Sequence, residues 1–340
     1  MRILIVKLSS LGDVIQTLPV VQDVRTAFAS ATVDWVVEEA FADLLQSVPG
    51  LGRVIVCAQR RWRKSPWDAQ VRAERQAFRE RLREQAYDAV IDAQGLIKSA
   101  LVARQARRVP GGFTATFGNA SEMCSYEWPV RWLLERGVPM PRQVHAVERT
   151  RLLAAGALGY GQAPFMAEPP RYPFAPLAPW PQRQGVWLCH GTTRADNEWP
   201  MDRWLALGRE LLATGQSLCI PQASDKEAAW AFELARRLGE GAEVLPRLTL
   251  SALLARMAQA RGVVSVDSGL GHLAVALDLP VVQLFSQPRI RRAGPVGRAH
   301  QCAVGGAQAP TVDEAWQAWL RCAHAAQVPA SVPTGLPLPA

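Results

Sequence analysis

The chain contains 340 residues, of which 49% are hydrophobic, and its formal net charge is +8. This length allows two domains of ordinary size, and because no apolar run approaches about 18 residues, no membrane-spanning helix is predicted. The positive charge favours an acidic partner, but it does not choose among nucleic acid, anionic lipid and a phosphorylated small molecule.

The expected compartment follows from two further features. The six cysteines are scattered without a C-x-x-C pair, so they predict neither a zinc site nor a disulfide framework. The first residues, MRILIVK, have the pattern of a strand and lack a signal-peptide cleavage site. We therefore expect a cytoplasmic protein.

The first predicted unit is a strand, a loop of small residues and a helix, at Ile3–Val6, 7–13 and Val14–Val24. Asp13 stands near the start of the helix. A carboxylate there is either a simple N-cap or, at the carboxyl edge of a parallel sheet, part of a ligand site. Lys7, Ser9 and Ser10 would crowd the same strand end with polar groups, which favours the ligand site.

The rest of the first half continues to alternate, with predicted strands at Val33–Val37, Arg53–Cys57 and Ala89–Ile91 and predicted helices at Arg72–Gln85 and from Leu96. This alternation is typical of a doubly wound sheet. Gly111–Trp128 has no period and is rich in small polar residues, which predicts a long loop. His145 opens a further helix, and its side chain is either a partly buried polar group or a ligand.

Four cations lie within five residues at Arg60-Arg61-Trp62-Arg63-Lys64, and Trp67 follows. Such a run is commonly a solvated loop. The alternative is a clamp for a polyanion, because guanidinium groups bind carboxylate and phosphate in bidentate fashion and tryptophan suits a membrane interface.

Seven prolines between Pro164 and Pro181 predict a stiff linker, after which the alternation restarts. The predicted strands of the second half are Val186–Cys189, Ser217–Ile220, Glu243–Leu245, Val263–Val266 and Val281–Phe285. Its predicted helices are Met201–Thr214, Glu227–Leu238, Leu250–Ala260, Leu273–Leu277 and Trp316–Ala326. We expect the stretch Val263–Phe285 to close the second sheet, and residues 328–340 to form a disordered tail.

Val263–Phe285 is also the most informative stretch for function. Its first strand stops at Asp267, and Ser268-Gly269-Leu270-Gly271 turns the chain into a helix. The start of such a helix offers unpaired N–H groups and partial positive charge, which suits a phosphate. The alternative is an ordinary crossover between two strands.

These patterns together predict an α/β protein with two doubly wound parallel-sheet domains that face a common cleft. The predicted first domain is 1–163, the linker is 164–184 and the second domain is 185–327. The final helix is a candidate for packing back on the first domain.

Several segments are similar to those of the ADP-heptose:lipopolysaccharide heptosyltransferases of glycosyltransferase family 9. They are MRILIVKLSSLGDVIQTLPV, DWVVEEAFA, RRWRK, YDAVIDAQGLIKSAL, HAVERTR and VVSVDSGLGHLAVALDLP. The resemblance extends from Met1 to about Phe285 and is closest to the branch that adds the first heptose of the inner core. It implies a GT-B fold with two Rossmann-like domains, an acceptor bound mainly by the first and a donor mainly by the second.

The implied reaction moves L-glycero-D-manno-heptose from ADP-heptose to the first Kdo of Kdo2-lipid A, with inversion and without a metal or other cofactor. We expect a monomer that binds no nucleic acid and associates peripherally with the cytoplasmic face of the inner membrane. Inversion needs one base for the acceptor hydroxyl, and Asp13 matches the base of the family in position and motif.

Donor and acceptor residues follow from the same resemblance. The implied donor-binding residues are Thr192, Thr193, Arg194, Asn197, Glu227, Asp267, Ser268, Gly269 and His272. The implied acceptor-binding residues are Ser10, Gly12, Arg60, Arg61, Arg63, Lys64, Gln94 and Arg149. The four cations of the RRWRK run fit an anionic glycolipid, which favours the clamp.

The chain departs from the family pattern at three places. Asn197 stands where a lysine is expected near the donor diphosphate, so we expect Arg194 to supply the missing charge or activity to be reduced. Gly271 replaces a typical serine, and Pro221-Gln222-Ala223-Ser224 differs from the expected loop. The alternative functions are transfer to a later core heptose, a nucleotide-binding oxidoreductase and a non-catalytic anion-binding protein. The first strand is followed by no G-x-G-x-x-G, which disfavours the oxidoreductase.

Overall fold

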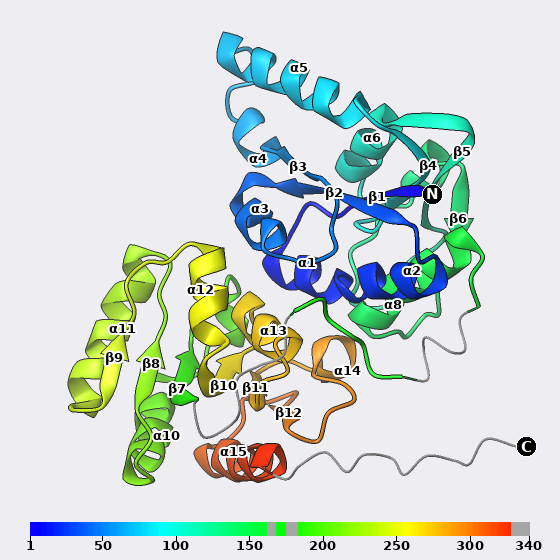
Figure 1. Cartoon of the computed structure of the whole chain (residues 1–340). Coiled ribbons are helices and arrows are strands. Elements are labelled where there is room, and N and C mark those ends of the chain that lie inside the picture. Colours follow the sequence, from blue (N-terminus) through cyan, green and yellow to red (C-terminus); the bar gives the residue numbers. More distant parts are fainter. Residues whose placement is uncertain (162–167, 175–182, 328–340) are drawn as a thin grey trace, which may run out of the picture.

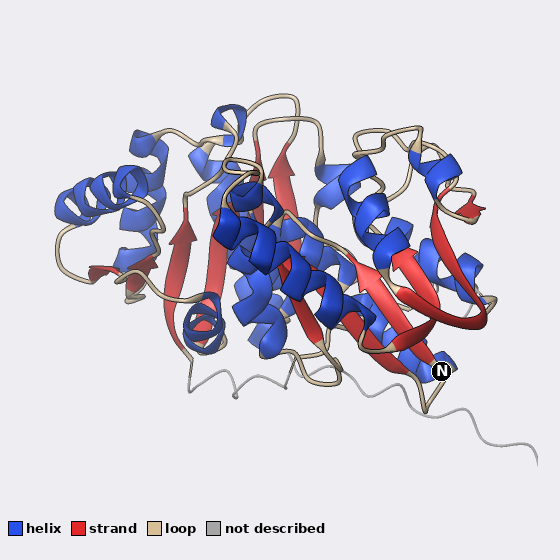
Figure 2. Cartoon of the chain, turned by 90° about the horizontal axis from the view of Figure 1, so that it is seen from above, coloured by secondary structure: helices blue, strands red, loops and turns tan. Residues whose placement is uncertain are grey.

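Two parallel six-stranded sheets form the centre of the computed structural model, which describes residues 1–161, 168–174 and 183–327. Figure 1 shows the two sheets as separate layers, and Figure 2 shows helices on both sides of the strands. The predicted tail at 328–340 lies outside the described residues, as do 164–167 and 175–182 of the predicted linker. The prediction of an α/β protein with two parallel sheets is confirmed.

The first sheet has the strand order β3-β2-β1-β4-β5-β6, and all of its pairings are parallel. Its strands are β1 (Arg2–Val6), β2 (Thr32–Glu38), β3 (Val54–Cys57), β4 (Ala86–Asp92), β5 (Arg107–Phe117) and β6 (Arg136–Val138). One face is covered by α1 (Leu11–Thr17), α2 (Pro19–Ala27), α3 (Glu39–Gln46) and α8 (Ala146–Leu158). The other face is covered by α4 (Gln59–Trp62), α5 (Ala69–Arg83), α6 (Ile97–Gln105) and α7 (Val130–Leu133).

The second sheet has the order β12-β11-β10-β7-β8-β9 and is also entirely parallel. Its strands are β7 (Gln184–Cys189), β8 (Leu218–Ile220), β9 (Ala242–Val244), β10 (Ala260–Val266), β11 (Val281–Phe285) and β12 (Gln301–Gly305). On one face lie α10 (Met201–Ala213), α11 (Asp225–Leu238) and α15 (Val312–Gln327), and on the other lie α12 (Leu250–Met257) and α13 (Gly269–Ala276). The short helices η2 (Ala195–Asn197) and α14 (Ile290–Ala293) belong to loops that follow strands.

Both sheets are buried on both faces, which explains their nearly continuous apolar strands. In β1, Ile3 and Ile5 belong to one core and Leu4 and Val6 to the other, because successive side chains of a strand point to opposite faces. No helix in the described ranges is both long and apolar enough to cross a bilayer.

The two halves meet through α1 and α3 of the first and α12 and α13 of the second. Ile15 and Leu44 of the first half are buried in the core that α12 and α13 share with the second sheet. Asp43 accepts a hydrogen bond from the Ser251 backbone N–H at 2.7 Å. Figure 1 shows α1 directly facing α13, so the helices that follow β1 and β10 lie side by side.

Some predicted elements differ from the structure for local reasons. The helix predicted at Val14–Val24 is divided in two, because Pro19 cannot donate an N–H and instead begins α2. The first part of the loop predicted at Gly111–Trp128 is strand β5. Its Pro110, Gly111 and Gly112 fall at an irregularity in the pairing with β4, and regular pairing resumes at Phe113.

Two predictions about the second half were wrong because they depend on how distant segments pack together. Val263–Phe285 does not close the sheet, because β12 adds a strand beside β11. The final helix α15 does not pack back on the first domain. It buries Ala315, Ala318 and Trp319 in the core that it shares with α10 and the second sheet, and Figure 1 shows it on the side remote from the first half.

Candidate active site

A cavity of about 740 Å³ lies between the carboxyl ends of the two sheets, where loops from both halves converge. Parallel strands place all their following loops at one edge, which is where open α/β sheets bind ligands. The structure brings most of the predicted site residues to this cavity: Ser10, Gly12, Asp13, Arg60, Thr192, Thr193, Arg194, Asn197, Glu227, Asp267, Ser268, Gly269 and His272. Gln94 and Arg149 line a recess that adjoins it.

Asp13 lies in the first turn of α1, and its side chain is 30% exposed. It is not the N-cap. Ser10 is the cap, and its backbone N–H and hydroxyl donate to Asp13 Oδ2 at 3.1 and 2.9 Å. Arg292 Nη2 lies 3.5 Å from the other carboxylate oxygen, Oδ1. Burial acts to raise the pKa of Asp13, but Lys7, Arg292 and the bonds from Ser10 outweigh it and hold the pKa below the usual range. Asp13 is therefore ionised at neutral pH.

Asp267 organises the other wall of the cavity. Its Oδ1 lies 3.5 Å from His272 Nε2, and its Oδ2 lies 3.8 Å from Arg289 Nη1. Asn197 donates through Nδ2 to the Asp267 carboxylate at 3.3 Å. Burial acts to raise the pKa of Asp267, but the bond from His272 and the nearby arginines lower it overall. Asn197, where the resemblance implies a lysine, is thus used to orient a carboxylate.

His272 connects the two halves. Its Nδ1 lies 3.4 Å from the amide nitrogen of Gln16 on α1 and 3.5 Å from that of Gln283 on β11. With a proton on Nε2 the ring donates to Asp267, and the two amide groups share the single lone pair of Nδ1. Gly12 is packed against the same ring, since a Cβ there would lie 2.6 Å from His272 Cδ2. Only glycine lets α1 approach α13 this closely.

The start of α13 opens into the cavity as the βαβ pattern predicts. Ser268 is the N-cap and accepts from the Gly271 backbone N–H at 3.4 Å. Gly269 and Leu270, the first residues of the helix, also line the cavity. Helix starts of this kind attract anions. Beside it, Thr192 donates to the Asp267 backbone carbonyl at 3.4 Å.

Glu227 lies in the first turn of α11, on the far side of the same cavity. Its carboxylate accepts from the Ala223 backbone N–H at 2.8 Å, and Ser224 caps the helix. Its carboxylate also lies so close to Gly191 that a Cβ at that glycine would be 2.9 Å from Glu227 Cδ. Glu227 lines the cavity, where its carboxylate offers an acceptor to a hydroxyl group of a ligand.

The sequence interpretation missed two arginines, Arg289 and Arg292, at the start and in the last turn of α14. Both line the cavity, with side chains 18% and 15% exposed, and they approach Asp267 and Asp13 respectively. The signal was present, because the basic run Arg289-Ile290-Arg291-Arg292 follows a strand as closely as the other site loops do. Arg194, expected to supply this charge, is instead paired with Asp196 at 2.9 Å and half exposed.

The recess beside Asp13 is positively charged. Arg149 is buried against the ring of Phe117, and its Nε and Nη2 have no hydrogen-bond partner among the described residues. Lys7 is buried beside it and donates to the Ala93 backbone carbonyl at 3.0 Å. Gln94 accepts from the backbone N–H groups of Leu8 and Ser9, so it holds the loop that leads to Asp13.

The cations of the RRWRK run do not act as one group. Arg60 lines the cavity and lies 5.8 Å from the ring centre of Phe41. Arg61 is bound by Glu39 and Glu74, so its charge is neutralised on the surface. Arg63 and Lys64 are exposed and do not line the cavity. The predicted clamp of four cations is therefore wrong, because only Arg60 of the run lines the cavity.

The question left open for His145 is answered by its contacts. It is the N-cap of α8, with Nδ1 accepting from the Val147 backbone N–H at 3.2 Å. Its Nε2 donates to the Gly294 backbone carbonyl at 2.9 Å, and burial lowers the pKa of His145 to about 4. This neutral histidine ties α8 to the end of α14 and so helps to fix Arg292.

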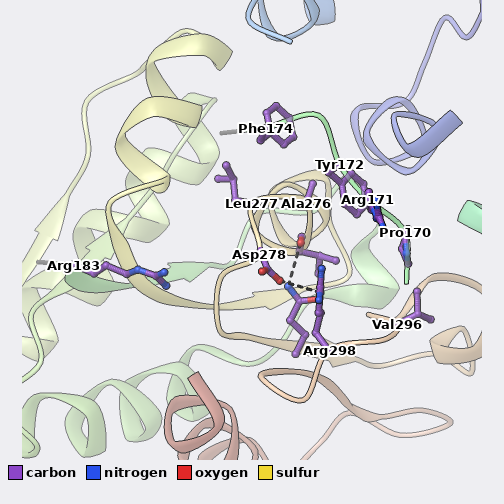
Figure 3. Close-up of a pocket in the computed structure, with 12 residues that line it drawn as sticks. Pro170, Arg171, Tyr172, Phe174, Arg183, Ala276, Leu277, Asp278, Val296 and Arg298 are labelled. Carbon is purple, nitrogen blue, oxygen red and sulfur yellow. Dashed lines mark hydrogen bonds and ion pairs between the residues drawn. The ribbon is translucent and has the colours of Figure 1, made fainter. Parts of the chain in front are cut away.

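A second cavity, of about 400 Å³, lies at the C-terminal end of α13, opposite the end that opens into the first cavity (Figure 3). Figure 3 shows Arg183, Asp278 and Arg298 around it, with Asp278 and Arg298 joined as an ion pair. It contains none of the predicted site residues. Among the described residues, no cluster of histidine, cysteine and acidic side chains has the arrangement to hold a metal ion.

Comparison with known proteins identifies the relatives of the chain. Residues 75–317 match the sequence model described as glycosyltransferase family 9 (heptosyltransferase). Lipopolysaccharide heptosyltransferase 1 of Pseudomonas aeruginosa is 41% identical over 308 residues, which cover 88% of this chain and 82% of that protein.

Two solved structures extend this comparison. Escherichia coli heptosyltransferase WaaC with ADP has a TM-score of 0.79 and 35% identity, covering 93% of this chain and 98% of that one. The same enzyme with ADP-2-deoxy-2-fluoro heptose has a TM-score of 0.74 and 35% identity, covering 92% and 96%. The two-sheet architecture of the chain is thus that of a solved glycosyltransferase, and the expected GT-B type of fold is confirmed.

Proposed function

Because the chain belongs to glycosyltransferase family 9, we propose that it transfers L-glycero-D-manno-heptose from ADP-heptose to the first Kdo of Kdo2-lipid A, with inversion and with Asp13 as the base. The names of its relatives and the ADP-heptose analogue bound by one of them support the donor. The observation that carries the proposal is that one cavity is lined both by Asp13 of the first half and by the helix start at Ser268 of the second half.

The reaction breaks the bond between the anomeric carbon and the diphosphate and forms one bond to the acceptor oxygen. The acceptor hydroxyl attacks the anomeric carbon from the first-domain side, its proton passes to the Asp13 carboxylate, and the bonding electron pair leaves with ADP. A base at this position must be ionised before the attack, and the lowered pKa of Asp13 meets that condition.

The leaving diphosphate needs compensation for its growing charge. The N–H groups at the start of α13 and the Thr192 and Thr193 hydroxyls are suited to it. Arg289, near Asp267, and Arg292, near Asp13, add two cations to the lining of the cavity, which offset the uncharged Asn197. Glu227 is suited to accept from the nucleotide ribose.

The acceptor assignment rests on charge. Arg149 keeps two buried nitrogen atoms without a hydrogen-bond partner among the described residues, beside buried Lys7 and next to Asp13. A sugar that carries a carboxylate, as Kdo does, would accept from these donors and also compensate their charge, whereas the hydroxyl groups of a neutral heptose would accept hydrogen bonds without compensating the charge. This favours the first Kdo over a later core heptose as acceptor. Because the chain belongs to a glycosyltransferase family, the oxidoreductase and the non-catalytic anion-binding protein are no longer candidates for its function.

A transfer assay tests the proposal. Purified protein is mixed with ADP-heptose and Kdo2-lipid A in the presence of EDTA, and both ADP release and the mass of the lipid product are followed. A lipid heavier by one heptose supports donor, acceptor and metal independence together. Product formed only from an acceptor that already carries heptose would replace the Kdo assignment, and no transfer to either acceptor would contradict the function. We further propose that the chain acts as a monomer at the cytoplasmic face of the inner membrane.

A further inference from the structure

An unusual share of exposed apolar surface is concentrated around α6 and α7. Of the ten large hydrophobic side chains that are exposed in the described part of the chain, five lie between residues 97 and 132. They are Ile97, Leu101, Met123, Trp128 and Trp132. Met123 lines the cavity, and we call the surface around the other four side chains the α6–α7 face. Trp128 and Trp132 are 59% and 66% exposed, which is high for the most costly side chains to leave in water.

The four side chains of the α6–α7 face belong to a continuous piece of structure. Trp128 and Trp132 form an edge-to-face pair with ring centres 4.4 Å apart. Ile97 and Leu101 are four residues apart on α6 and therefore share one side of it, and α6 packs against α7. The Glu127 carboxylate accepts from the Ile97 backbone N–H at 2.6 Å, so the tryptophan pair is attached to the start of α6.

The α6–α7 face is also basic. Arg104 follows Leu101 by one turn on the same side of α6 and is exposed. Arg131 is exposed and lies 5.7 Å from the ring centre of Trp132. Glu127, the acid within the face, is occupied by its bond to α6. Exposed tryptophan and arginine on one surface match the headgroup region of an anionic bilayer, which is apolar on one side and charged on the other.

The α6–α7 face lies next to the first-domain side of the cavity. Met123 is 49% exposed and lines the cavity together with Ser125, and Trp128 follows on the same loop. The Glu127 backbone N–H donates to the Gly95 carbonyl, at the carboxyl end of β4, at 2.9 Å. The face is thus continuous with the first-domain side of the cavity, from which an acceptor would enter.

We infer that the α6–α7 face docks on an anionic lipid bilayer, with Trp128 and Trp132 inserted among the headgroups and Arg104 and Arg131 on lipid phosphates. The inference rests on the proposed function in one respect: a lipid acceptor explains why a bilayer would lie at this end of the cavity. Its occupant is the bilayer surface itself, because the basic residues around the apolar centre complement anionic lipid.

Sedimentation of the full chain with vesicles tests the inference. We compare phosphatidylcholine vesicles with vesicles that also contain phosphatidylglycerol. The wild-type chain should bind the anionic vesicles more strongly, and W128A/W132A should lower its partitioning by about tenfold or more, because the two rings lose their burial in lipid. R104Q/R131Q should reduce the preference for anionic vesicles and leave the thermal transition unchanged. F232A is the matched control, since Phe232 on α11 is 61% exposed in the other half and should have no effect.

The outcomes distinguish membrane docking by this face from catalysis in the cavity. W128A/W132A should keep wild-type turnover with a water-soluble Kdo acceptor that lacks acyl chains, while losing turnover with Kdo2-lipid A in vesicles. Equal vesicle binding by W128A/W132A and wild type would overturn the inference. A wild-type dimer that W128A/W132A converts to monomer, without vesicle binding by either, would overturn it in favour of a second copy. Vesicle binding without any heptosyl transfer would leave the inference standing and contradict the proposed function instead.

Discussion

Replacing Asp13 by asparagine tests the centre of the proposed mechanism. The change removes the basic oxygen but keeps an oxygen that accepts from Ser10, so the N-terminal turn of α1 retains its cap. Loss of a cap costs about 1 kcal/mol, and here only part of that is lost, while domains are stable by roughly 5 to 15 kcal/mol. The variant therefore stays folded, and a large loss of rate reports on chemistry.

The magnitude follows from the role of a base. A positioned general base contributes about 10² to 10⁴ in rate, or roughly 3 to 5.5 kcal/mol of barrier at about 1.4 kcal/mol for each factor of ten. We expect kcat of D13N to fall by that factor, with the Kd for ADP unchanged because the nucleotide side of the cavity is untouched. ADP release with saturating substrates measures kcat, and a titration with ADP measures binding.

The matched control is D313N, which makes the same change of charge in the first turn of α15, remote from the cavity. It should keep wild-type turnover. A D13N enzyme within tenfold of the wild-type kcat would refute the assignment of Asp13 as base. Equal losses of kcat in D13N and D313N would show that net charge, and not the carboxylate at position 13, carries the effect.

Three further predictions concern charge in the cavity and in the core. R292Q removes the cation 3.5 Å from Asp13, so the pKa of Asp13 should rise and the acid limb of the kcat/KM profile should move to higher pH; an unchanged profile would contradict this coupling. D23N deprives the buried Arg151 of its carboxylate at 2.7 Å and should lower the free energy of unfolding by about 3 to 5 kcal/mol in a urea titration; a loss under about 1 kcal/mol would show that the pair is not structural. Burial raises the pKa of Asp92 to about 6, so its contribution to stability is present below the unfolded pKa of 3.8 and is lost as pH rises through about 6, by about 3 kcal/mol. D92N should flatten this dependence between pH 4 and 7 in thermal melts, and an unaltered slope would assign it to other groups.

Much of the fold was predictable because the relevant signals are local. Buried parallel strands are short apolar runs, and polar loops follow them, so β1, β7 and β11 could be located from the sequence. Ser268 and Gly269 after β10 predicted a helix start at the sheet edge for the same reason. The elements that escaped prediction lacked this pattern. β5 contains proline and glycines at its bulge, and α14 has only four residues.

The sequence predicted which residues belong to the candidate site, but it did not predict which of their charges are neutralised by a partner. The sequence placed Asp13 and Asp267 at strand ends, and their meeting in one cavity follows from parallel topology. It could not show that Arg61 is neutralised by Glu39 and Glu74, since partners 13 and 22 residues away meet only when α3, α4 and α5 pack together. The run of cations therefore suggested a larger clamp than the structure contains.

The sequence by itself determined the two parallel-sheet halves, the loops that carry polar groups and the resemblance to a glycosyltransferase family, because these are written in short stretches of neighbouring residues. Only the tertiary structure decided which charges act together. Arg292 reaches Asp13 from a helix that is 279 residues away in the chain, and Gln16 meets His272 across the two halves. Such pairs form because α1 packs close to α13 and α14. The pattern of residues within one segment carries no information about the distance between two segments.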